Sequence, residues 1–171
     1  MRLSPGKTLI THIDEGLDFL GWRIQRHRKR GTSKHYVYVY PSKKAVLAAK
    51  RKIKTLCRQV TTSQSLDVLL RRVNSTLRGW SGYFRAGVSS AVFSYLSHYT
   101  WKTVWRWLLR KHRKLTRIQI RRRYFDGRWW PATENRELIK LEKIGTTRYR
   151  YRGSVIPSPW PDAEEREIAA A

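Results

Sequence analysis

Residues 66–85 read LDVLLRRVNSTLRGWSGYFR, and this stretch decides the fold. Its apolar residues recur at intervals of three and four, a spacing that places side chains on one side of an α-helix. They are Leu66, Leu69, Leu70, Val73, Leu77 and Trp80. Arg71, Arg72 and Arg78 fall largely outside that stripe. The stretch therefore predicts a helix with one face for a core and another for an acidic partner.

The composition indicates a folded and very basic chain. Its 171 residues suffice for one ordinary core, and 40% of them are hydrophobic, which argues against a disordered basic tail. Lys and Arg number 37 against 12 Asp and Glu, a net charge of +25. Nucleic acid is the expected partner, because neutralising phosphates releases counterions. An acidic membrane surface is the weaker alternative, since no apolar run approaches the ~20 residues of a membrane-spanning helix.

The segments on either side of residues 66–85 also show helical periodicity. Ser42 is an expected N-cap for a helix reaching about Val60, and Ser65 is expected to cap the central helix. A third helix should begin near Ser89 or Ser90 and run to about His112, because neither proline nor glycine interrupts it. One more short helix is predicted at residues 116–124. Three long amphipathic helices with short connections predict a small basic bundle.

Short strands are predicted outside the helical region. Residues 17–24 read as a strand in which Gly21 marks a bulge or a close backbone approach, and residues 36–40 read as its hairpin partner. The basic tip of this hairpin is either a solvated loop or a contact for the nucleic-acid backbone. Residues 138–141 and 146–151 predict a small, irregular β extension. The expected fold is α+β and mainly α.

Four consecutive units follow from these elements. They are residues 1–41 with the hairpin, residues 42–124 with the helical bundle, residues 125–160 with the β extension, and a flexible acidic tail at residues 161–171.

The sequence offers little for catalysis or metal binding. Cys57 is the only cysteine, which excludes an intrachain disulfide and a cysteine-based zinc site and suggests a reducing, cytoplasmic location. The acidic residues form no pair suited to two-metal catalysis, and the five histidines lack metal-ligand spacing. We expect no catalytic residue, no metal and no cofactor.

Basic residues on the outer faces of the helices are the candidate phosphate contacts. Arg78 belongs to this set with a second interpretation, because its place beside Gly79 equally suits a structural role. The candidates are Lys43, Lys44, Lys50, Arg51, Lys54, Arg58, Arg71, Arg72, Arg78, Arg106, Arg110, Lys111, Arg113, Lys114 and Arg117.

Aromatic residues are interleaved with these cations, and spacing alone leaves two roles open for them. Each is either core or a platform on which a base stacks, and core is favoured because aromatic side chains bury much area. The set is Trp80, Tyr83, Phe84, Trp101, Trp105 and Trp107.

Two motifs in combination carry a family resemblance. They are LDFLGW at residues 17–22, with Phe19, Leu20, Gly21 and Trp22, and LRGWSGYF at residues 77–84, with Gly79, Trp80, Tyr83 and Phe84. Together with PSKK at residues 41–44 and the segments 101–107 and 110–112, they resemble the C-terminal part of group II intron reverse transcriptases. The resemblance covers residues 3–124, and more loosely the chain to residue 160. It corresponds to the end of the palm followed by the thumb, or maturase-specific, domain.

The resemblance implies an intron-encoded protein of a mobile element, whose thumb-like bundle binds intron RNA, assists splicing and clasps an RNA/DNA hybrid. The sequence contains neither the Tyr-x-Asp-Asp box of the polymerase nor an HNH nuclease with cysteine pairs. We therefore expect a reverse transcriptase fragment that is not an enzyme by itself. An alternative is the thumb subunit of a split reverse transcriptase with a separate fingers/palm chain. A generic DNA-binding module is disfavoured, because no short recognition helix is evident.

Overall fold

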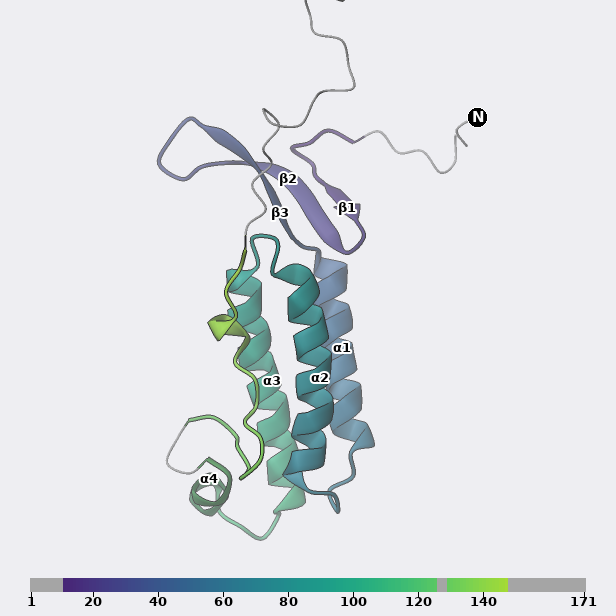
Figure 1. Ribbon diagram of the computed structural model, residues 1–171, viewed down its shortest axis with the longest axis vertical. Coiled ribbons are helices and arrows are strands. Elements are labelled where there is room, and N and C mark those ends of the chain that lie inside the picture. The colour runs from purple at the N-terminus through teal and green to yellow at the C-terminus, as the bar shows by residue number, and fades with distance from the viewer. Residues whose placement is uncertain (1–10, 126–128, 148–171) are drawn as a thin grey trace, which may run out of the picture.

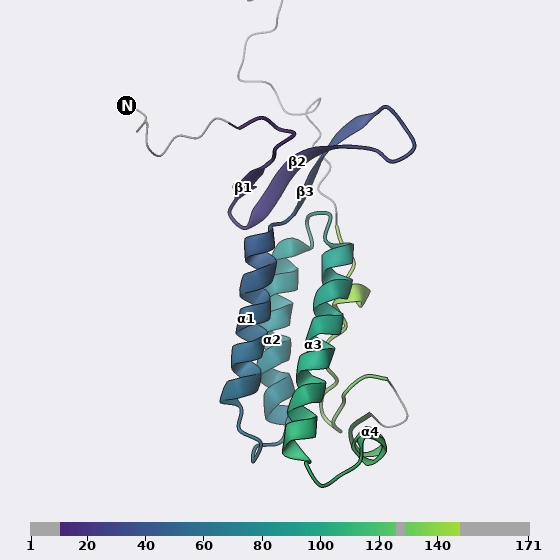
Figure 2. The same cartoon turned by 180° about the vertical axis from the view of Figure 1, so that it is seen from behind.

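The computed structural model describes residues 11–125 and 129–147. A small β-sheet sits at one end of three long helices that run alongside one another, and a shorter helix lies at the opposite end (Figure 1; Figure 2 shows the reverse side). The elements are β1 (Leu17–Phe19), β2 (Trp22–Arg28), β3 (His35–Pro41), α1 (Lys43–Gln59), α2 (Leu66–Phe84), α3 (Ser90–Lys111), α4 (Arg117–Phe125) and the 3-10 helix η2 (Leu141–Lys143). The expected α+β, mainly α, architecture is confirmed.

The N-terminal sheet has three antiparallel strands in the order β1-β2-β3. Leu20 and Gly21 both have positive φ angles, 47° and 83°, and they connect the paired residues Phe19 and Trp22. Such a two-residue connection is the tight turn that matches the twist of a hairpin. The prediction of one strand across residues 17–24 with a bulge at Gly21 was therefore wrong, because the chain reverses there. The second hairpin, between β2 and β3, is confirmed.

The helix boundaries agree with the sequence patterns. The Ser42 hydroxyl accepts a hydrogen bond from the amide of Ala45 (3.2 Å), which is the predicted cap of α1. Ser65 precedes α2, but its side chain makes no capping bond, so that detail was wrong. Before α3, the Ser89 hydroxyl donates to the carbonyl of Phe84 (2.6 Å) and thereby fastens the turn between α2 and α3.

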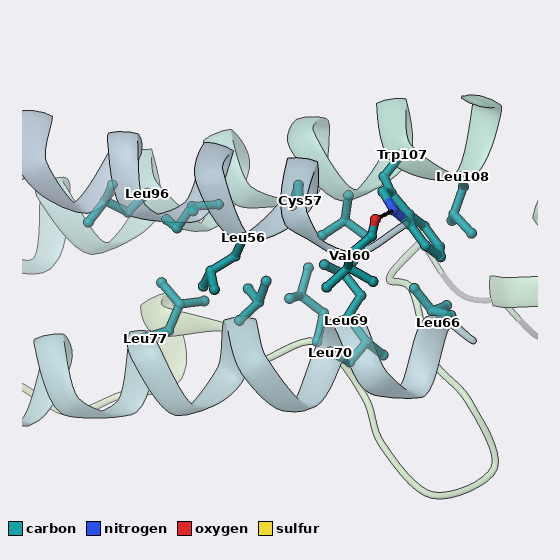
Figure 3. Packing of buried hydrophobic residues seen from close by; sticks show 14 of the residues in the cluster. Leu56, Cys57, Val60, Leu66, Leu69, Leu70, Leu77, Leu96, Trp107 and Leu108 are labelled. Carbon is teal, nitrogen blue, oxygen red and sulfur yellow. Dashed lines mark hydrogen bonds between the residues drawn. The ribbon is translucent and has the colours of Figure 1, made fainter. Parts of the chain in front are cut away.

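The core forms where the apolar stripes of α1, α2 and α3 meet (Figure 3). Leu69, Leu70 and Val73 of α2 are fully buried, as the spacing predicted. Trp107 of α3 is also fully buried, and its indole N–H donates to the carbonyl of Val60 (2.8 Å; Figure 3). This bond satisfies the polar atom of the largest core side chain and joins α3 to the end of α1.

The two sequence motifs meet in space and join the sheet to the bundle. The ring centroids of Trp22 and Phe84 lie 4.7 Å apart, and the Tyr83 hydroxyl donates to the carbonyl of Leu20 (2.9 Å). A Cβ atom at Gly87 would lie 2.3 Å from the Trp22 ring, so the chain needs glycine there. We call Leu20, Trp22, Tyr83, Phe84 and Gly87 the sheet–bundle joint.

Residues 79–84 pack differently from the sequence-based expectation. The sequence suggested a packed corner that sets the angle between the second and third helices. In the structure these residues are the last turns of α2, and Trp80 does contact Phe93 of α3 with ring centroids 5.9 Å apart. Tyr83 and Phe84 pack mainly against the sheet instead.

Within residues 129–147, the predicted β extension is reduced to one isolated bridge, between Ala132 and Glu137. No strand forms at residues 138–141, because side chains from the bundle bind this backbone. Asn74 of α2 donates to the carbonyl of Glu137 (2.8 Å) and accepts from the amide of Ile139 (2.9 Å). These bonds replace the ladder that a strand would need.

The structure describes only part of the C-terminal region for which strands and a tail were predicted. Thr146 and Thr147 form no strand, and residues 148–151 of that predicted strand lie outside the described residues. The predicted acidic tail at residues 161–171 also lies outside them.

The burial of Trp107 gives a test of the core. We expect Trp107→Ala to lower the free energy of unfolding by about 3–5 kcal/mol, because it removes a fully buried indole and leaves a cavity. Trp80→Ala should cost less, since Trp80 is only half-buried. Urea denaturation of both variants measures the difference. A loss for Trp80→Ala equal to that for Trp107→Ala would contradict this ranking.

Candidate nucleic-acid interface

Positive charge is concentrated on the four helices. They carry seven basic residues on α1, three on α2, four on α3 and four on α4, against one acidic residue, Asp67. Arg136 binds Asp67 with 2.5 Å between Nη1 and Oδ2, so even this carboxylate faces a cation. The helical surface therefore attracts polyanions almost without internal competition.

The clearest array of cations is a row on α1. Lys44, Arg51, Lys54 and Arg58 are all exposed, and spacings of seven, three and four residues place them on one side of the helix. The row covers about 21 Å of helix axis at 1.5 Å per residue. It is long enough to face several consecutive phosphates. Lys43 is exposed beside its first turn.

The outer face of α2 carries Arg71, Arg72 and Arg78, all exposed. Within the described ranges, the Arg78 side chain has no hydrogen bond or ion pair, so the structural role considered for it gains no support. Gly79 and Gly82 lie on the same exposed face, and a Cβ atom at either would meet nothing within 4 Å. This part of α2 is smooth and open to a ligand.

A second group of cations lies where α3 ends and α4 begins. Arg106, Arg113, Lys114 and Arg117 are exposed there. Residues 110–115 also line a surface hollow together with Thr62. Phosphate groups have access to these side chains from the end of the bundle opposite the sheet.

Three of the predicted contacts are instead bound within the protein. The Lys50 ammonium donates to the Tyr95 hydroxyl (2.6 Å) and lies 4.9 Å from the centroid of the Tyr99 ring. Lys111 donates to the carbonyls of Thr62 (2.7 Å) and Gln64 (2.8 Å), and Arg110 to the carbonyl of Cys57 (3.1 Å). Lys50 and Lys111 are half-buried, so these internal bonds compete with any phosphate for their ammonium groups.

Five exposed cations on these helices were absent from the sequence-based set. They are Lys52, Lys102, Arg121, Arg122 and Arg123. The run Arg121–Arg123 is a visible signal of charge, but α4 has so little apolar periodicity that its outer face could not be assigned.

The aromatic set divides by burial. Phe84 and Trp107 are buried, and Trp80, Trp101 and Trp105 are half-buried against the core. Tyr83 is exposed, but its hydroxyl is bonded within the sheet–bundle joint. These positions favour the core interpretation over base stacking for the set.

Two titratable side chains of the helical bundle, Lys50 and His112, have shifted pKa values. The hydrogen bond to Tyr95 raises the pKa of Lys50, which fixes its ammonium form. Burial lowers the pKa of His112, assisted by the charges of Arg123 and Lys111. His112 therefore adds no substantial positive charge near neutral pH.

Among residues 11–125 and 129–147, no three His, Cys, Asp or Glu side chains gather closely enough to hold a metal ion. Within the same ranges, every helix is too short or too polar to cross a bilayer.

Comparison with known proteins adds a family match. Residues 46–125 match the family model described as "Group II intron, maturase-specific domain". The match runs from Val46 in the first turn of α1 to Phe125 at the end of α4 and does not include the sheet. No curated protein matches the chain. The family resemblance seen in the sequence is confirmed.

Cys57 is buried in the core, and its reactivity can be tested. Burial raises the pKa of its thiol from 9.0 to about 12, although nearby Arg110 acts in the opposite direction. We expect alkylation at about pH 8 to be far slower in the native protein than in urea, because only the thiolate reacts. Iodoacetamide labelling followed by mass spectrometry measures both rates. Equal rates would show that Cys57 is accessible and ionised in the native state.

Proposed function

Because the chain carries a group II intron maturase-specific domain at residues 46–125, we propose that it binds group II intron RNA and assists splicing. The observation that carries the proposal is the coincidence of that match with the four helices that hold the concentrated cations. A folded RNA presents dense phosphates, and a protein that neutralises them stabilises the compact form.

The row on α1 is the proposed principal phosphate-binding element. Arg51 and Arg58 can each donate two parallel hydrogen bonds to a phosphate, whereas Lys44 and Lys54 act as point charges. All four extend from one rigid helix whose opposite face is locked in the core. Such preorganisation reduces the entropy lost when the side chains bind.

We further propose that this chain does not polymerise DNA by itself. Its sequence has no Tyr-x-Asp-Asp box, and in residues 11–125 and 129–147 no three His, Cys, Asp or Glu side chains gather closely enough to hold a metal ion. Its contribution in this proposal is binding and positioning. A cytoplasmic location is part of the same proposal, and it is supported by the single cysteine, which suits a reducing compartment.

A second candidate function is the thumb subunit of a split reverse transcriptase, which would also contact an RNA/DNA hybrid. It is favoured by exposed apolar side chains on the sheet, namely Phe19 at 59%, Leu20 at 71% and Val37 at 55%. A fingers/palm chain would cover them. Primer extension that appears only after such a chain is added would support this function, and extension by the purified protein alone would contradict both candidates.

Matched charge removals test the proposed RNA interface. Arg51→Gln, Lys54→Gln and Arg58→Gln together should weaken binding to group II intron RNA. The slope of log affinity against log salt concentration is negative, and its magnitude should decrease by about 0.7 to 0.9 for each phosphate that the variant no longer neutralises. Filter binding over a range of salt concentrations measures both quantities.

The control removes three charges from the hairpin tip, with Lys29→Gln, Arg30→Gln and Lys34→Gln, and should change the slope less. Equal effects of the two triple variants would show that affinity follows net charge alone. A structured RNA of equal length that is unrelated to introns provides the second control. Equal affinity of the unaltered protein for both RNAs would overturn the intron-specific role.

A further inference from the structure

Trp129 is exposed, unlike the other tryptophans that the structure describes. Its residue exposure is 72%, whereas the remaining six in residues 11–125 and 129–147 are buried or half-buried. Moving an indole ring out of water is strongly favourable. An exposed indole that is held in place is therefore a candidate contact for a ligand.

The backbone around Trp129 is fixed. The indole N–H of Trp101 donates to the carbonyl of Trp129 (2.9 Å), and that of Trp130 donates to the carbonyl of Leu138 (2.5 Å). The amide of Ala132 donates to the carbonyl of Tyr124 (2.9 Å) at the end of α4. The protein therefore presents the Trp129 ring on a rigid base.

A cation covers part of that ring. The guanidinium carbon of Arg121 lies 4.2 Å from the centroid of the Trp129 ring, within the range of a cation–π contact. The high exposure of Trp129 shows that much of the ring remains accessible beside this contact. Arg117, Arg121 and Arg122 are exposed on α4, a helix without acidic residues.

We propose that Trp129 and Arg121 form a stacking site for an unpaired base of RNA. The base stacks on the open part of the indole, and the arginines of α4 bind the phosphates beside it. Unpaired bases offer a planar π face to aromatic rings and guanidinium groups, whereas bases inside a duplex are already stacked. This inference rests on the proposed function, because it specifies which part of the RNA the α4 end of the bundle binds.

Two RNAs and three variants test the site. The RNAs are a group II intron hairpin with a single-stranded loop and a fully paired duplex of the same length. We expect Trp129→Ala to weaken binding to the loop RNA about 10-fold or more and to leave duplex binding unchanged. Trp129→Phe should retain most of the affinity. Ile118→Ala, which alters an exposed apolar residue on the neighbouring helix α4, should change neither affinity.

The outcomes separate this inference from the proposed function. If the unaltered protein fails to bind intron RNA, the proposed function is wrong. If the unaltered protein binds intron RNA and Trp129→Ala binds each of the two RNAs as tightly as the unaltered protein does, the stacking site is wrong. Equal losses on both RNAs, or a lowered melting temperature of Trp129→Ala, would assign Trp129 a structural role. Loss of binding to anionic lipid vesicles with RNA binding unchanged would assign it to a membrane surface.

Discussion

Mutual burial of the apolar faces of α1, α2 and α3 in one core is the interaction that holds the other elements in place. Leu69, Leu70 and Val73 of α2 are fully enclosed there, and the three arginines of the same helix are left outside. A chain with a net charge of +25 resists compaction, so the apolar stripes must offset that repulsion. The same packing keeps cations out of the core and displays them on the helix surfaces, where a polyanion can relieve their repulsion.

Two further sets of interactions attach the peripheral elements to this core. The sheet–bundle joint uses Trp22 and Phe84 to seat the sheet on the end of the bundle. Asn74 and Ser97 bind the backbone of residues 137–141 along the helices. Asn74 and Ser97 are buried, and their polar atoms find partners in this backbone, so the second attachment is specific as well as apolar. The carbonyl of Trp129 is held separately, by the indole N–H of Trp101.

Local patterns predicted the helices well, because apolar spacing and capping residues act within a few positions of each other. The Leu20-Gly21 turn was missed, since a leucine with positive φ gives no sequence signal. The strand at residues 138–141 was wrong because its backbone partner, Asn74, lies 63 residues from Glu137. Lys50 looked like a surface cation for the same reason, as Tyr95 lies 45 residues away. Local periodicity identified which helices carry charge, and long-range partners decided which charges remain available.

The central claim is that this basic surface is directed at group II intron RNA. Crosslinking in cells that express the protein, followed by sequencing of the bound RNA, tests it most directly. We expect crosslinked reads to be enriched in group II intron sequence far above the abundance of that RNA. Reads distributed over all cellular RNA in proportion to abundance would contradict it and leave only an unspecific polyanion-binding protein.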